Sequence, residues 1–203
     1  ADLCEKVGAD VIDVARGIGM DARIGRQFLN AGPGIGGSCF PKDTLALVKT
    51  AHDADSPVRL VEATVAVNDQ RKRAMAKKII RACGGSVRGR TVAILGLTFK
   101  PDTDDIRESP AIPIITALQD AGARIRAHDP EGMTHAEAAL TGVTYCGDAH
   151  EAADGADAVV IVTDWPVFRN LDLARLRRTM ATPVMVDLRN VYDAATVTAA
   201  GIE

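Results

Sequence analysis

Residues 91–96 have the sequence Thr91-Val92-Ala93-Ile94-Leu95-Gly96, a run of apolar residues that ends at a glycine. Such a run predicts a buried strand, and Ala158-Val159-Val160-Ile161-Val162 has the same character. Further strand patterns cover residues 124–129 and 184–186, and a weaker one covers residues 143–146. Because helical patterns separate these runs, we expect residues 86–203 to form an α/β domain with a doubly wound, parallel, Rossmann-like sheet.

The first 85 residues have helical patterns only. Asp10 is placed to cap the second half of a helical segment over residues 1–18. Pro41 is expected to open a helix that runs to about His52, because proline suits the first helical position. Residues 57–83 predict one long helix of about 40 Å. A helix of that length is typical of a connector between domains or of a subunit interface.

The composition excludes several classes of function. The chain has 203 residues and a formal net charge of −3, so it offers no global attraction for nucleic acid or anionic membranes. The basic run 71–81 is interpreted as a solvated helix face. No apolar stretch reaches the roughly 18 residues of a membrane span. The start of the chain resembles the middle of a helix and not a signal peptide, so we expect a piece of a longer protein.

The four cysteines do not predict a metal site. None belongs to a CxxC pair or has zinc-site partners at short spacing, so a reducing, cytoplasmic setting is expected. Cys4, Cys83 and Cys146 stand in apolar or helical surroundings and are expected to be small core residues. Cys39 does not fit that description.

The loops after the strands are the expected ligand sites, because ligands bind beyond the carboxyl ends of such sheets. These loops are residues 96–109, 129–130, 163–165 and 187–190. The turn after the first strand supplies one glycine, Gly96, where a dinucleotide fingerprint has three. A complete NAD site in residues 86–203 is therefore not expected, although another kind of nucleotide stays open.

The segment Gly36-Gly37-Ser38-Cys39-Phe40-Pro41-Lys42-Asp43 carries the most chemical information. Cys39 stands just before a predicted helix, where free N–H groups and the helix dipole favour the thiolate over the thiol. The glycines allow close approach of a ligand. Asp43 follows one turn later and is expected to face the same space, where it could hold a water or relay a proton. A carboxylate there could equally serve only to counter the helix dipole.

Two long motifs resemble the UDP-glucose/GDP-mannose dehydrogenase family. The first spans residues 23–43 and contains Phe28-Leu29-Asn30-Ala31-Gly32-Pro33-Gly34-Ile35-Gly36-Gly37-Ser38-Cys39. The second is Leu95-Gly96-Leu97-Thr98-Phe99-Lys100-Pro101-Asp102-Thr103-Asp104-Asp105-Ile106-Arg107-Glu108-Ser109-Pro110. Later landmarks are His128-Asp129-Pro130 and Asp187-Leu188-Arg189-Asn190. The resemblance covers the whole chain.

The resemblance implies a three-part enzyme, of which this chain matches the last two parts. An N-terminal Rossmann domain binds NAD, a helical central domain forms a homodimer, and a Rossmann-like domain binds the nucleotide of the sugar. Residues 1–85 then correspond to the end of the central domain and residues 86–203 to the nucleotide-sugar domain. The NAD domain is absent, together with an upstream lysine and asparagine of the family.

The resemblance also implies the chemistry. The family oxidises the sugar's primary alcohol to a carboxylate in two NAD-linked steps. Cys39 would attack the aldehyde to give a thiohemiacetal, whose oxidation gives a thioester that water hydrolyses. Asp43 would assist proton transfer and water. The sugar nucleotide stays open between UDP-glucose, GDP-mannose and a UDP-N-acetylhexosamine. An alternative is that the chain alone is only a nucleotide-sugar-binding and dimerisation module.

The family's binding residues fall on positions that this sequence matches. The expected substrate contacts are Arg23 from a partner subunit, Phe28, Leu29, Asn30, Gly32, Ile35, Gly36, Phe99, Lys100 and Arg189. Arg107 is the expected NAD contact. Ile35 departs from the family, which often has phenylalanine there.

Several of these residues also have a structural interpretation. Lys100 and Arg189 could be surface charges, and Arg107 could pair with a neighbouring carboxylate. Trp165 favours packing over base stacking, and His128 favours a structural role over a catalytic one.

Overall fold

The structure, a computed structural model, describes all residues from Ala1 to Glu203. The chain forms two compact units, Ala1–Gly32 and Pro33–Glu203. The first unit contains the short helix α1 (Asp2–Val7) and helix α2 (Val11–Gly19). The predicted cap of α2 is confirmed, because the Asp10 carboxylate accepts a hydrogen bond of 2.8 Å from the Ile12 amide.

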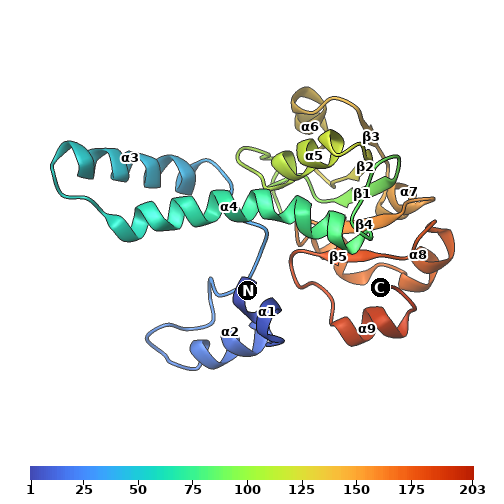
Figure 1. Ribbon diagram of the computed structural model, residues 1–203, viewed down its shortest axis with the longest axis horizontal. Helices are drawn as coiled ribbons and strands as arrows, with labels where there is room; N and C mark the ends of the chain where they lie inside the picture. The colour runs from blue at the N-terminus through green and yellow to red at the C-terminus, as the bar shows by residue number, and fades with distance from the viewer. The chain divides into compact units, whose positions relative to one another are not determined.

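A helical hairpin opens the second unit. Helix α3 (Cys39–Asp53) is followed by α4 (Arg59–Ala82), which packs along it. Figure 1 shows the hairpin extending from the α/β body. The C-terminal half of α4 belongs to that body, because Met75, Ala76 and Ile79 are buried in its core. The predicted long connector is therefore confirmed, and it joins the hairpin to the sheet.

The predicted parallel sheet is confirmed as five strands in the order β3-β2-β1-β4-β5. The strands are β1 (Thr91–Leu95), β2 (Arg124–His128), β3 (Val143–Tyr145), β4 (Ala158–Ile161) and β5 (Met185–Asp187). All four neighbouring pairs are parallel. From β1 the chain adds β2 and β3 on one side, and it then crosses back to add β4 and β5 on the other side of β1. The switch point therefore lies between β1 and β4, where doubly wound sheets bind their ligands.

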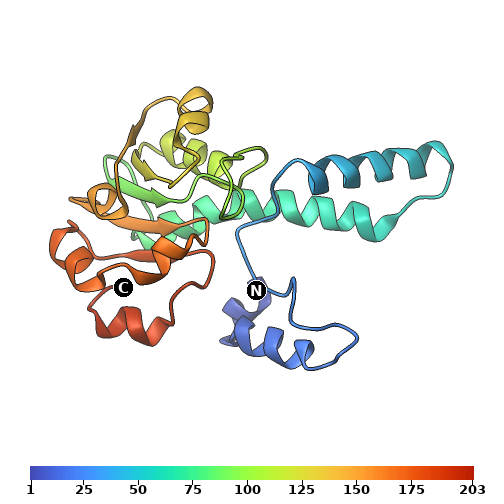
Figure 2. The same cartoon turned by 180° about the vertical axis from the view of Figure 1, so that it is seen from behind.

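Helices cover both faces of the sheet (Figures 1 and 2). Because neighbouring residues of a strand face opposite sides, Val92 and Ile94 join one core while Ala93 and Leu95 join the other. The first core takes side chains from α4, α5 (Ala111–Asp120) and α6 (Met133–Ala139), and the second takes them from α7 (Ala149–Ala153), the 3-10 helix η1 (Pro166–Asn170) and α8 (Leu173–Thr179). Helix α9 (Ala194–Ala199) follows β5. None of the helices combines the length and apolarity that crossing a bilayer requires.

Ile79 provides a test of how strongly α4 is attached to the sheet. Its side chain is fully buried, so Ile79→Ala removes apolar contacts and leaves a cavity. We expect a loss of about 2–5 kcal/mol in the free energy of unfolding, measured by urea denaturation. Lys77→Ala, at an exposed position of the same helix, is the matched control and should change that free energy by less than about 0.5 kcal/mol. Equal effects of the two substitutions would contradict the burial of this helix face.

Candidate active site

Cys39 is the first residue of α3, and its side chain is exposed. The predicted start of this helix at Pro41 is wrong by two residues. Proline is tolerated inside the first turn, because the N–H groups there have no partner within the helix. The Ser38 side chain does not cap the helix. The thiol therefore stands among the free amides at the positive end of the helix dipole.

The thiol opens onto a groove along α3. The groove has a volume of about 380 Å³ and is lined by Cys39, Phe40, Asp43, Thr44 and Leu47. Asp43 lies one helical turn after Cys39 and shares this groove with it, as the spacing predicts. Its carboxylate lies 3.3 Å from the Lys42 ammonium and is largely exposed, so it is free to hold water. The catalytic roles of the two residues stay predictions.

The loop before Cys39 packs closely on a second segment of the chain. A side chain at Gly37, which has a φ of +85°, would lie 2.8 Å from the Phe99 ring. At Gly36, a side chain would lie 2.6 Å from the Glu108 carbonyl oxygen. Glycine is thus required here for protein packing as well as for any ligand approach. Ile35, by contrast, has an exposed side chain.

Arg107 joins this segment to the loop and to a carboxylate. Its carbonyl oxygen accepts a hydrogen bond of 2.8 Å from the Gly37 amide. Its guanidinium forms a bidentate pair with Asp105, at 2.9 and 2.8 Å, so the pairing that the sequence left open is with Asp105. This pairing raises the pKa of Arg107, and the electrostatic influence of the nearby Cys39 side chain adds to the rise. The guanidinium stays mostly exposed, so a ligand could still reach it.

Arg189 links the loops after β1, β4 and β5 at the carboxyl edge of the sheet. Its guanidinium donates to the Val162 carbonyl at 2.9 Å and to the Phe99 carbonyl at 3.1 Å, and lies 3.5 Å from Asp164. Burial lowers the pKa of Arg189 from its usual value. The interpretation of Arg189 as a surface charge is therefore wrong. Lys100 is exposed, and its ammonium lies 5.5 Å from the centre of the Phe99 ring.

Asp129, which the sequence places in one of the expected ligand loops without a role of its own, organises the switch point. It is fully buried and accepts hydrogen bonds from the amides of Leu97, Thr98, Glu131 and Gly132. Burial alone would raise the pKa of Asp129, but these backbone hydrogen bonds outweigh it and the pKa is lowered. The carboxylate is therefore a fixed negative charge beneath the loop after β1.

Trp165 and His128 are structural, as the sequence favours. The Trp165 ring is buried, and its N–H donates to Thr98 and Asp129 at 3.1 and 3.2 Å. His128 is buried against Phe168, with Nδ1 2.9 Å from the Cys146 carbonyl oxygen. Trp165 therefore has no free face for a base to stack on.

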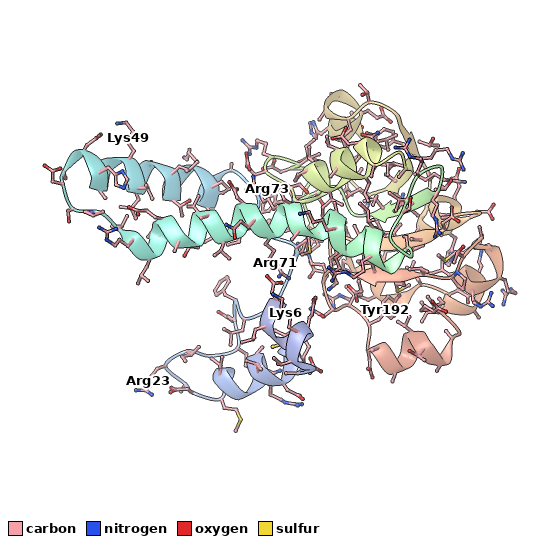
Figure 3. All side chains as sticks on the ribbon, in the orientation of Figure 1. Lys6, Arg23, Lys49, Arg71, Arg73 and Tyr192 are labelled. Atoms are coloured by element: carbon pink, nitrogen blue, oxygen red, sulfur yellow. The ribbon has the colours of Figure 1, made fainter.

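The remaining predicted substrate contacts, Arg23, Phe28, Leu29, Asn30 and Gly32, lie in the first unit. Arg23 extends from the turn after α2 (Figure 3), where its guanidinium pairs with Asp21 at 2.6 Å. Phe28 has a φ of +64° and is 95% exposed. A large aromatic ring with that exposure is a candidate contact for a ligand or for another protein surface.

Two residues of α4 beside the Cys39 loop were missed from the sequence. Asn68 hydrogen bonds to Ile35, and Lys72 to Glu108. The interpretation of the whole run 71–81 as a solvated face is wrong at Lys72, which is buried. The missed signal is spacing, since residues 68 and 72 continue the apolar helical stripe of Met75 and Ile79.

Two family models match the chain. Residues 1–70 match the central domain of the UDP-glucose/GDP-mannose dehydrogenase family, and residues 93–194 match its UDP binding domain. A UDP-glucose 6-dehydrogenase of Rhizobium meliloti (strain 1021) is 66% identical over 192 residues, which are 95% of this chain and 44% of the relative. The chain thus spans less than half the length of that relative.

Solved structures agree with these matches. A UDP-glucose dehydrogenase from Pyrobaculum islandicum superposes with a TM-score of 0.83 at 38% identity, over 94% of this chain and 42% of that protein. An NDP-N-acetyl-D-galactosaminuronic acid dehydrogenase from Methanosarcina mazei Go1 superposes with a TM-score of 0.86 at 27% identity, over 98% and 44%.

The buried charge of Asp129 predicts a pH-dependent stability. A lowered pKa in the folded state stabilises the fold above the unfolded-state value of about 3.9, and this stabilisation is lost as the pH falls through the lowered pKa. Asp129→Asn should reduce the free energy of unfolding at pH 7 by more than about 2 kcal/mol, because an amide cannot accept all these bonds. The difference from the parent should shrink in urea titrations below pH 4. Asp120→Asn, at an exposed position, is the control, and a difference for Asp129→Asn that is independent of pH would refute the assignment.

Proposed function

The chain belongs to the UDP-glucose/GDP-mannose dehydrogenase family, and on that premise we propose that it is the thiol-bearing and substrate-binding part of an NAD-dependent UDP-glucose 6-dehydrogenase. One observation carries the proposal: the exposed Cys39 thiol and the Asp43 carboxylate share a groove at the start of a helix. A nucleophile and a group able to relay protons are what oxidation of an aldehyde to an acid requires.

The first oxidation converts the primary alcohol of the sugar to an aldehyde, with loss of a hydride and a proton. The Cys39 sulfur then adds to the aldehyde carbon, forming a C–S bond and a thiohemiacetal whose oxygen carries the proton. Loss of a second hydride and of that proton gives a thioester. NAD, when bound, accepts the hydride in each oxidation.

Hydrolysis of the thioester completes the reaction. A water molecule held by Asp43 attacks the thioester carbon and gives up a proton to the carboxylate. The C–S bond breaks, the carboxylic acid leaves, and the proton returns to the Cys39 sulfur. The overall change converts one alcohol and one water to one carboxylate, with two hydrides transferred and three protons released.

The described residues do not fit a complete NAD site. Gly96 is the only glycine in the turn after β1, and a group placed on it would lie 2.5 Å from Thr163. We therefore expect NAD to be held by the part of the relatives that this chain does not match. The exposed guanidinium of Arg107 would add one contact to it from this chain.

The nucleotide sugar would lie at the switch point of the sheet. The loops after β1, β4 and β5 meet there through Arg189, and Lys100 offers an exposed cation for phosphate or sugar hydroxyls. The further proposed contacts are Phe28, Leu29, Asn30, Gly32, Ile35 and Gly36, and Arg23 would be contributed by a partner subunit. A cytoplasmic setting is proposed because the four thiols are free.

A fusion enzyme tests the proposal directly. The part of the Rhizobium meliloti enzyme that this chain does not match is joined to these 203 residues, and NADH formation from UDP-glucose is followed. We expect two NADH per UDP-glucuronate from the fusion and none from the chain alone. Cys39→Ser should abolish acid formation, and Asp43→Asn should slow it about 100-fold, within the usual range for a general base.

Cys146→Ser is the matched control for the thiol, because Cys146 is buried away from the groove. Full turnover by the Cys39→Ser fusion would contradict the covalent mechanism.

A different nucleotide sugar is the second candidate, supported by the superposition on the Methanosarcina mazei dehydrogenase. A larger kcat/KM for GDP-mannose or a UDP-N-acetylhexosamine than for UDP-glucose would favour that candidate. Binding of UDP to the isolated chain in calorimetry, with no turnover by the fusion, would favour a binding module.

We also propose that the hairpin of α3 and α4 forms a homodimer. It leaves Leu45, Leu60 and Val67 exposed, and Leu60 is 86% exposed. Light scattering should give twice the 21.4 kDa of one chain. The double variant Leu60→Glu, Val67→Glu should be monomeric, and Lys77→Glu, at an exposed position nearer the sheet, should stay dimeric. A monomeric parent chain would refute this proposal.

A further inference from the structure

The loop that leads to Cys39 is held on one side by an amide side chain of α4. The Asn68 carbonyl oxygen accepts a hydrogen bond of 2.7 Å from the Ile35 amide, and the Asn68 amide group donates to the Ile35 carbonyl at 3.2 Å. Both backbone groups of Ile35 are therefore satisfied by one side chain, in the way that a neighbouring strand would satisfy them. The loop has no strand neighbour of its own, so Asn68 takes that place.

Lys72 holds the same loop one turn further along α4. A side chain at Gly34, which has a φ of +142°, would lie 2.7 Å from the Lys72 Cγ atom, so the lysine stem passes directly over this glycine. The Lys72 ammonium donates to the Glu108 carbonyl at 2.9 Å and lies 3.3 Å from the Glu108 carboxylate. A buried ammonium is unfavourable unless it is paired, so Lys72 is committed to these partners.

Residues 107–108, which accept the hydrogen bond from Lys72, contact the other side of the loop. Glu108 has a φ of +54°, an unfavourable conformation for a residue other than glycine, and Lys72 is bonded to its carbonyl. The neighbouring Arg107 carbonyl accepts the Gly37 amide. The loop is therefore bound on one side to α4 and on the other to residues 107–108, and Lys72 ties these two supports together.

The position of the loop is in this way fixed relative to the core of the sheet, because α4 is anchored in that core. Residues 68, 72, 75 and 79 lie on one stripe of α4, and Ile79 is fully buried. Figure 3 labels Arg71 and Arg73, which flank Lys72, near the middle of this helix. Cys39 follows the held loop after a single residue, Ser38.

We infer that Asn68 and Lys72 are positioning residues that hold the loop 34–37 in the conformation that presents the Cys39 thiol to its substrate. The inference rests on the proposed function for its catalytic meaning. Neither side chain is among the expected substrate contacts. Loss of either should therefore slow the chemistry of the sulfur while leaving substrate affinity largely unchanged, since small misplacements of a reacting group are costly.

The first test uses the 203-residue chain and needs no catalysis. Asn68→Ala and Lys72→Met are compared with Gln70→Ala and Lys77→Met, which change exposed positions of the same helix. Lys72→Met keeps the stem over Gly34 and removes the ammonium. We expect hydrogen exchange at the Ile35 and Gly37 amides to accelerate at least tenfold in the first pair, and the rate of Cys39 alkylation by iodoacetamide to change at least threefold. Rates equal to those of the controls would overturn the inference.

The second test measures turnover by the fusion enzyme. Asn68→Ala and Lys72→Met should lower kcat by about 10- to 100-fold, with the KM for UDP-glucose within about threefold of the parent. Loss of substrate affinity at unchanged kcat would overturn the positioning role. A parent fusion without activity would end the proposed function, whereas exchange and alkylation would still decide whether the loop is held. If Lys72→Met does not fold, Asn68→Ala decides both tests.

Discussion

The contact between α4 and the sheet is the constraint on which the candidate site depends. Met75 and Ile79 fix the C-terminal half of the helix in the first core. The N-terminal half then extends from the body and packs against α3. Because the helix is continuous, side chains near its middle occupy fixed positions relative to the strand ends. The loop before Cys39 lies against this middle part of α4. The position of the thiol therefore depends on the packing of Met75 and Ile79, further along the same helix.

Most of the sheet could be predicted from the sequence, because buried parallel strands are apolar on both faces. The runs at β1 and β4 match the observed strands within one residue at each end. The start of α3 was less predictable. Pro41 suits the first helical position, yet the helix begins at Cys39, because proline is also tolerated elsewhere in the first turn. That difference of two residues moves the thiol from beside the helix into its first turn.

From residue spacing alone, the candidate site was predictable only where its residues are local in sequence, and distant members such as Arg189 were predicted from the family motifs. Cys39 and Asp43 are one turn apart, so helical geometry alone brings them to one groove. Arg189 and Lys72 are different, because their hydrogen-bond partners are distant in sequence. The partners of Arg189 lie 27 and 90 residues away, and the partner of Lys72 lies 36 residues away. A charged side chain has the same helical or loop propensity whether it is solvated or buried. Only the tertiary structure distinguishes the two states, although a lysine on an apolar stripe is a usable warning.

The proposed chemistry needs water at the sulfur for hydrolysis but favours its exclusion during hydride loss. The geometry of the second unit meets the first of these requirements. Hydrolysis of a thioester needs a water molecule beside the sulfur, and the groove at Cys39 is open with an exposed carboxylate. Loss of a hydride is favoured where solvent is excluded. The loop next to the thiol is held firmly from two sides, but nothing in residues 33–203 encloses the sulfur itself. The second unit therefore supplies the position of the thiol, and the proposed chemistry would need groups outside residues 33–203 to exclude water from the sulfur.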